Sequence, residues 1–274
     1  MCGIDYVETG SGPTILFVPG SYSMYAAWRP IQKLLVPAYR MVGTSLCGYG
    51  TTLETRKRDD CRMQHEVRIV EEAARRAGGQ VHLVGHSFGA TVALAAALGN
   101  SVNVASLALF EANPLALLRE QSNEMLHQET HTFSSEFEAA VHAGEADAPA
   151  RIIDFWGGHG TFAAMPEAVR NYCRETAPAN VLDWQSDFGF DAGKDKYAAL
   201  HIPILLVRGA LANPAMVAMT EALKQALPDA RAAVVQGAGH FLITSQANEC
   251  AALLNGFLGE VGEQTGDSAL GASI

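Results

Sequence analysis

Positive charge is scarce in this sequence. Among 274 residues, 19 Lys and Arg stand against 29 Asp and Glu, which gives a net charge of −10 when His is neutral. No long run of Lys and Arg occurs, although a protein that neutralises the phosphates of a nucleic acid needs clustered cations. The sequence therefore argues against a nucleic-acid partner.

Long hydrophobic runs and closely spaced cysteines are also missing. The best apolar stretches, Ala90–Leu98 and Ile202–Val207, are far shorter than the roughly 20 residues that cross a bilayer. The segment Met1–Asp5 lacks the basic and apolar parts of a signal peptide. Five scattered cysteines without a C-x-x-C argue against a disulfide scaffold and a zinc module. We expect an acidic cytoplasmic protein with no membrane partner, metal or cofactor, and its oligomeric state stays open, with a homodimer as one alternative.

An alternation of short apolar runs and helix-forming segments is present instead. Such alternation, with strands that are apolar throughout, predicts an α/β fold with a mostly parallel sheet and helices on both faces. The predicted strands are Thr14–Val18, Arg40–Ser45, Val81–Gly85, Val104–Phe110, Ile202–Val207 and Arg231–Val235. The predicted helices are 24–36, His65–Ala77, Phe88–Leu98, Ala215–Leu227 and Ser245–Leu258.

The alternation is interrupted between residues 114 and 199. Strand-like runs nearly vanish there, and helix-like segments rich in aromatic residues follow one another. We therefore expect residues 1–113 and 200–262 to form the α/β core, and residues 114–199 to form a helical cap inserted into it. The small and polar residues 263–274 are expected to form a flexible tail.

A G-x-S-x-G pattern, Gly85-His86-Ser87-Phe88-Gly89, lies directly between a predicted strand and a predicted helix. This is the setting of a nucleophile elbow, in which a serine occupies a strained turn and small neighbours let the backbones pass. The turn presents the hydroxyl at the carboxyl edge of the sheet, where open α/β proteins bind ligands. Ser87 is therefore the candidate nucleophile, against the alternative of a plain glycine-rich turn.

From about residue 5 to about residue 260 the chain resembles the α/β-hydrolase superfamily. Phe17–Ser21 resembles its oxyanion-hole loop, with Pro19 where many members carry histidine. Ser45–Gly50 resembles its D-x-R-G-x-G turn, although serine and cysteine replace the aspartate and arginine. Gly237–His240 matches the segment that ends in the catalytic histidine, and the helical insertion matches the cap domain. The resemblance implies a serine hydrolase with a catalytic triad.

His240 is the candidate base, because it follows a buried strand through a glycine-rich loop and should emerge at the same sheet edge as Ser87. The superfamily most often keeps its acid in a G-x-x-D segment after the strand here read as Ile202–Val207, but Gly209–Pro214 holds no carboxylate. Glu111 ends the strand that follows the elbow, where some branches of the superfamily, including many haloalkane dehalogenases, keep their acid. We expect Glu111 to orient His240, with Asn213 as a neutral alternative.

Two backbone amides complete the expected site. The N–H of Phe88 begins the helix after the elbow, and by resemblance the second oxyanion donor is the N–H of Ser21. An apolar lid over the serine implies an apolar or aromatic acyl substrate. The residues expected to line the substrate pocket are Tyr22, His86, Phe155, Trp156, Trp184 and Phe241. The charged run Arg56-Lys57-Arg58, which Asp59-Asp60 follows, is expected to be a solvated loop.

These observations predict an enzyme that cleaves an ester, lactone or thioester bond of a small molecule through an acyl-enzyme. Two alternatives from other classes stay open. One is a cofactor-free, non-hydrolytic enzyme of the same fold, of dioxygenase or lyase type, which would use His240 and Glu111 without Ser87. The other is a ligand receptor with slow turnover.

Overall fold

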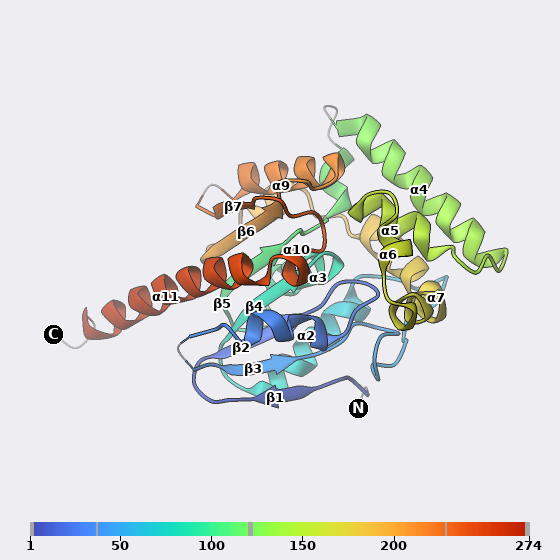
Figure 1. Cartoon of the computed structure of the whole chain (residues 1–274). Coiled ribbons are helices and arrows are strands. Elements are labelled where there is room, and N and C mark those ends of the chain that lie inside the picture. Colours follow the sequence, from blue (N-terminus) through green and yellow to red (C-terminus); the bar gives the residue numbers. More distant parts are fainter. Residues whose placement is uncertain (1–2, 37, 120–122, 228, 272–274) are drawn as a thin grey trace.

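The computed structural model describes residues 3–36, 38–119, 123–227 and 229–271, with side chains up to residue 263. A seven-stranded sheet runs through its centre in the order β1-β3-β2-β4-β5-β6-β7, and only β1 is antiparallel to its neighbour (Figure 1). The α/β-hydrolase architecture predicted from the alternation is therefore confirmed. The strands are β1 (Val7–Thr9), β2 (Thr14–Val18), β3 (Arg40–Gly43), β4 (Val81–His86), β5 (Val104–Phe110), β6 (Ile204–Gly209) and β7 (Arg231–Val235).

Helices cover both faces of the sheet, because successive side chains of each strand point to opposite faces. Leu16 and Val18 of β2 pack into one apolar cluster, whereas Ile15 and Phe17 pack into another. The first cluster is closed by α2 (Gln64–Ala77), α3 (Phe88–Leu98) and part of α9 (Pro214–Ala226). The second is closed by η1 (Tyr25–Trp28), α1 (Arg29–Gln32), α10 (Leu242–Ser245) and α11 (Ala247–Gly271).

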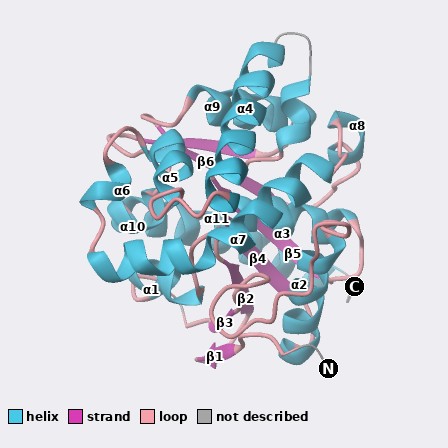
Figure 2. Cartoon of the chain, turned by 90° about the vertical axis from the view of Figure 1, so that its right-hand side faces the viewer, coloured by secondary structure: helices cyan, strands magenta, loops and turns pink. Residues whose placement is uncertain are grey.

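The segment between β5 and β6 is helical, as the sequence predicts. Its helices gather over the carboxyl ends of the strands and face the viewer in Figure 2. They are η2 (Leu115–Arg119), α4 (Glu124–His142), α5 (Pro149–Gly157), α6 (Thr161–Ala164), α7 (Glu167–Gly189) and α8 (Lys194–Tyr197). Helix α8 contacts the core, because its buried Tyr197 belongs to the same apolar cluster as Leu16 and Val18 of β2.

At several elements the structure differs from the sequence expectations. The helix expected over 24–36 is only the short pair η1 and α1, which Pro30 and the loop ahead of β3 limit. The sequence pattern does not predict strand β1, because this strand is three residues long and mostly exposed. Helix α11 continues to Gly271 where a flexible tail is expected from residue 263, since extending an existing helix adds one hydrogen bond per residue; residues 272–274 lie outside the described residues. Among the described helices, none is long and apolar enough to cross a membrane.

Candidate active site

The turn that carries Ser87 has the backbone geometry expected of an elbow. Ser87 has φ 54° and ψ −131°, a conformation that side-chain-bearing residues rarely adopt. A Cβ on Gly85 would lie 2.5 Å from Cα of Ala90, and a Cβ on Gly89 would collide with the carbonyl oxygen of Pro19. The two glycines are therefore required for β4, α3 and the loop after β2 to meet at this point.

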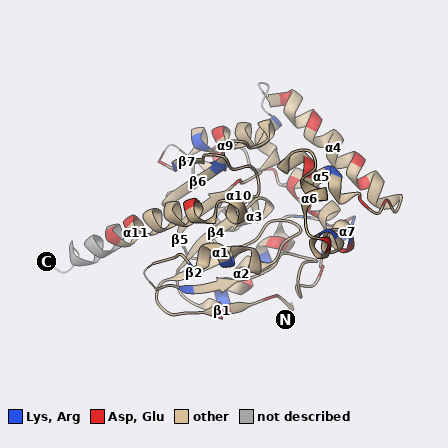
Figure 3. Cartoon of the chain, viewed as in Figure 1, with Lys and Arg blue, Asp and Glu red and all other residues tan. Residues whose placement is uncertain are grey.

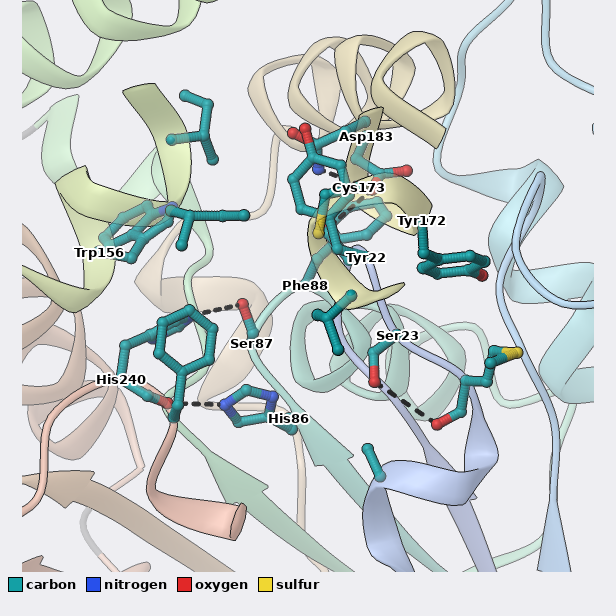
Figure 4. A pocket seen from close by; sticks show the side chains of 18 of the residues that line it. Tyr22, Ser23, His86, Ser87, Phe88, Trp156, Tyr172, Cys173, Asp183 and His240 are labelled. Carbon is teal, nitrogen blue, oxygen red and sulfur yellow. Dashed lines mark hydrogen bonds between the residues drawn. The ribbon is translucent and has the colours of Figure 1, made fainter. Parts of the chain in front are cut away.

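Ser87, His240 and Glu111 form one chain of hydrogen bonds. Oγ of Ser87 lies 2.9 Å from Nε2 of His240, and Nδ1 of His240 lies 3.1 Å from Oε2 of Glu111. Figure 4 shows Ser87 and His240 side by side at the floor of a pocket. Their exposed fractions are 7 % and 4 %, and Glu111 is fully buried. The three residues come from three strand ends that are far apart in the sequence.

The backbone at Glu111 is also strained, with φ 52°. Its N–H donates to the carbonyl of Val207 at 2.7 Å, and its Oε1 accepts from the N–H of Gly209 at 2.6 Å. Each carboxylate oxygen therefore has a donor, which a buried carboxylate requires. Strain that the surroundings hold in place is typical of functional sites.

Asn213, the neutral alternative to Glu111, is engaged elsewhere. Its Oδ1 accepts from the N–H of Ala215 at 2.8 Å and caps α9, while its Nδ2 donates to the carbonyl of Phe155 at 2.8 Å. Both polar groups of the amide are occupied away from His240. The alternative that Asn213 orients His240 is therefore wrong for this structure.

His86 ties the elbow to the loop that carries His240. Its Nε2–H donates to the carbonyl oxygen of His240 at 2.9 Å, as Figure 4 shows. Burial, with a smaller contribution from the neighbouring His240, lowers the pKa of His86 to about 3. His86 is therefore neutral near pH 7 and acts as a fixed hydrogen-bond donor.

The loop after β2 lies against the elbow, where the expected oxyanion donors should meet. A Cβ on Gly20 would be 2.9 Å from Cβ of Ser87, so the backbone at this point approaches closely. Within the described residues, neither the N–H of Ser21 nor that of Phe88 has a hydrogen-bond acceptor. Both amides are free to receive a ligand oxygen.

A cavity of about 650 Å³ opens above Ser87, between the sheet edge and the cap. Trp156 of α5 stacks on the imidazole of His240, with ring centroids 5.5 Å apart. Of the residues expected to line the pocket, Tyr22, His86, Trp156, Trp184 and Phe241 do so.

Phe155 is an incorrect expectation, since it is not among the residues that line this cavity. Its half-buried ring packs against Phe133 and Trp156, with centroids 4.6 and 4.7 Å away, beside the apolar cluster of the cap. Consecutive residues on a helix point in directions about 100° apart, and in α5 Trp156 faces the cavity whereas Phe155 faces Phe133 of α4. The helical phase of α5 therefore places Trp156, and not Phe155, at the wall of the cavity.

A second nucleophilic side chain, Cys173 of α7, also lines the cavity. Burial raises the pKa of this thiol to about 11, so it is protonated near pH 7 and a weak nucleophile. No group of three or more His, Cys, Asp and Glu that could hold a metal ion occurs within the described residues.

Arg56 and Asp183 are prominent in the structure but not in the sequence analysis. Arg56 was expected in a solvated loop, yet its side chain is fully buried and bonds to Asp183 of α7 at 2.6 Å. It also pairs with Glu66 at 2.8 Å and Glu54 at 2.7 Å. A buried arginine is stable only when carboxylates surround it. Asp183 lies 127 positions away in the sequence, so no local pattern could have identified this pair.

Comparisons with known proteins agree with this architecture. A thermophilic esterase from Thermogutta terrifontis is 20% identical, with a TM-score of 0.73, 94% of this chain and 93% of that chain being covered. MenH from S. aureus is 14% identical, with a TM-score of 0.75 and coverages of 94% and 98%. A bromoperoxidase from Bacillus anthracis is 20% identical, with a TM-score of 0.72 and coverages of 93% and 95%.

At these identities the solved structures establish the fold alone. Comparison with curated proteins finds no significant match. Residues 15–253, however, match the model of the alpha/beta hydrolase family, which spans most of the chain, including all three residues of the hydrogen-bonded chain. The protein therefore belongs to the alpha/beta hydrolase family.

Proposed function

We propose that this protein is a serine hydrolase that cleaves an ester-type bond through an acyl-enzyme. The observation that carries the proposal is the hydrogen-bonded chain Ser87–His240–Glu111 at the floor of the cavity. A serine hydroxyl is a weak nucleophile until a base removes its proton, and an imidazole held by a carboxylate is suited to that task near neutral pH. In this proposal Ser87 is the nucleophile, His240 the base and Glu111 the orienting acid.

In the first half of the reaction, Oγ of Ser87 attacks the substrate carbonyl carbon while its proton moves to Nε2 of His240. The carbonyl oxygen becomes an oxyanion, which the amides of Ser21 and Phe88 stabilise. The intermediate then collapses, the bond to the leaving group breaks, and His240 gives its proton to the leaving oxygen or sulfur. Glu111 holds Nδ1–H of His240 throughout and stabilises the transient imidazolium.

In the second half, a water molecule replaces the leaving group. His240 accepts a proton from that water, whose oxygen attacks the acyl carbon, and the same two amides hold the second oxyanion. Collapse breaks the bond between the acyl carbon and Oγ of Ser87, which takes the proton back from His240. The products are a free acid and the original enzyme.

The cavity supports a small apolar or aromatic substrate. Aliphatic and aromatic side chains such as Ile152, Trp156 and Val169 dominate its walls, and its volume suits a molecule of modest size. The similarity to an esterase from Thermogutta terrifontis is consistent with ester cleavage. Ester, lactone and thioester substrates share the carbonyl chemistry that the proposal requires.

A cytoplasmic location is part of the same proposal. The four cysteines within the described residues, Cys47, Cys61, Cys173 and Cys250, are free thiols. Free thiols are typical of a reducing compartment.

Covalent labelling tests the proposal directly. The purified protein is incubated with a fluorophosphonate probe, the adduct is located by mass spectrometry, and turnover of p-nitrophenyl esters is measured. We expect one adduct, on Ser87. Ser87→Ala should remove the adduct and lower kcat about 10³-fold or more, and Glu111→Gln should lower kcat by a comparable factor. Ser135→Ala, on the exposed side of α4, is the matched serine control and should retain labelling and turnover.

Two outcomes would overturn the proposal in different ways. Folded wild-type protein without an adduct and without ester turnover would favour a slow-turnover receptor. Chemistry that survives in Ser87→Ala but is lost in Glu111→Gln would favour the cofactor-free, non-hydrolytic enzyme.

A further inference from the structure

A polar connection joins the cap to the loop that holds the second oxyanion donor. Asp183 lies in the C-terminal half of cap helix α7 and is 2 % exposed. Its Oδ2 accepts a hydrogen bond of 2.5 Å from the hydroxyl of Ser21 and one of 2.6 Å from the hydroxyl of Tyr49. Its Oδ1 is bonded to Nη1 of Arg56 at 2.6 Å. We call these four residues, Ser21, Tyr49, Arg56 and Asp183, the Asp183 latch.

The core side of the latch is rigidly held. The guanidinium of Arg56 also donates to the backbone carbonyl of Cys47 at 3.2 Å and is paired with the buried Glu66. Tyr49 is fully buried in the core cluster. Asp183 therefore occupies a fixed position relative to the core, and Ser21 is fastened to it by one short hydrogen bond.

The place of Ser21 gives this bond its significance. Ser21 follows Gly20, whose backbone lies against the elbow, and its main-chain N–H is the proposed second oxyanion donor. A donor must stand within a few tenths of an ångström of its required position to stabilise the transition state fully, because misplacement by about 1 Å can cost about 100-fold in rate. Figure 4 shows Asp183 above Tyr22, the residue that follows Ser21.

We propose that Asp183 is a positioning residue, which holds the oxyanion loop through Ser21 and thereby makes the oxyanion hole depend on the docked cap. This inference rests on the proposed function. The cap is then more than a wall of the pocket, since helix α7 aligns a main-chain group that contacts the substrate oxygen. The hydroxyl of Ser21 takes no part in the chemistry and acts only as the link.

Two serine variants form a matched pair. Ser21→Ala deletes the hydroxyl that links the oxyanion loop to Asp183 and leaves the pair with Arg56 intact, whereas Ser186→Ala deletes a hydroxyl of helix α7 that donates to the backbone carbonyl of Cys61. Both hydrogen bonds join the cap to the core, but Ser186 is not among the residues that line the cavity. We expect Ser21→Ala to lower kcat about 10-fold or more with KM within twofold of wild type, and Ser186→Ala to leave both near wild type.

A transition-state mimic separates positioning from a general loss of structure. A trifluoromethyl ketone forms a tetrahedral adduct with Ser87 whose oxyanion needs both amides, whereas the matched methyl ketone binds largely without it. Ser21→Ala should weaken inhibition by the trifluoromethyl ketone by the same factor as kcat/KM and leave the methyl ketone unchanged. In an Asp183→Ala background, which lacks an acceptor for the Ser21 hydroxyl, the effect of Ser21→Ala should largely disappear.

These experiments distinguish a failure of the Asp183 latch from a failure of the proposed hydrolase function. If wild type is active but Ser21→Ala and Ser186→Ala behave alike in kcat and in inhibition, the positioning role of Asp183 is wrong and the proposed hydrolase activity still stands. Wild type that neither reacts with the fluorophosphonate nor hydrolyses esters would overturn both.

Discussion

At the scale of single residues, the site is built from groups whose environment fixes their chemical state. Ser87 and Glu111 both adopt left-handed backbone conformations, which neighbouring strands hold in place. His86 is buried and neutral beside the proposed base, and its one N–H donor is used on the carbonyl of His240. Such a group binds a proton far less readily when the protein is folded than when it is unfolded.

The depressed pKa of His86 predicts how stability changes with pH. The pKa falls from 6.5 in the unfolded chain to about 3 in the folded protein, so protons favour unfolding as the pH drops below 6.5. His86→Gln retains an N–H donor but cannot take up a proton. From pH 6.5 to pH 4, the free energy of unfolding of wild type should fall more steeply than that of the variant, by about 1 kcal/mol per pH unit. Urea denaturation at each pH measures this, and parallel pH profiles would contradict the assignment.

At the scale of elements, the sequence predicts those helices, strands and site residues that a local residue pattern determines. Helix α3 and strands β2, β5 and β7 have the predicted bounds, because apolar runs between clear turn signals define them. Ser87 and His240 were identified from glycine-rich motifs, and Glu111 from its place at a strand end. Arg56 and Asp183 were missed because their meeting depends on how the cap docks, which no periodicity encodes. The sequence does not predict the orientation of α5 either, because it also depends on how the cap docks. This orientation turns Phe155 away from the cavity.

Asn213 offers a test at the junction between β6 and α9. Its side chain caps α9 and bonds to the cap at Phe155, and it does not contact His240. Asn213→Ala should lower the free energy of unfolding by about 1 kcal/mol and keep ester turnover within about twofold of wild type. Thermal denaturation and steady-state kinetics measure the two effects. Abolished turnover in a folded variant would return Asn213 to the candidate catalytic residues and count against Glu111.

At the scale of the whole molecule, negative charge dominates, with a net charge of −10. Figure 3 shows acidic positions along α4 without basic residues between them. Among the described residues that line the cavity, Asp183 and Asp187 carry carboxyl groups, and none is Lys or Arg. The cavity therefore provides no cation to replace the hydration of an anionic substrate.

Substrate charge should consequently control turnover. p-Nitrophenyl butyrate and p-nitrophenyl hemisuccinate have acyl chains of equal carbon number, but the second ends in a carboxylate. We expect kcat/KM for the hemisuccinate to be about 10-fold lower or more, because its carboxylate meets carboxyl groups and apolar walls. Steady-state kinetics at two salt concentrations measure the long-range part of the effect, which salt should weaken. Equal values for the two esters would show that the acyl chain does not enter the cavity.

The location of the proposed acid directly after β5 has a practical consequence for the turn that follows the neighbouring strand β6. If Glu111 is the acid, as proposed, the turn between β6 and α9 need not supply a catalytic carboxylate, and Leu211 in this turn is largely exposed to solvent. A fluorophore or an immobilisation tag attached at Leu211 should therefore leave ester hydrolysis unchanged.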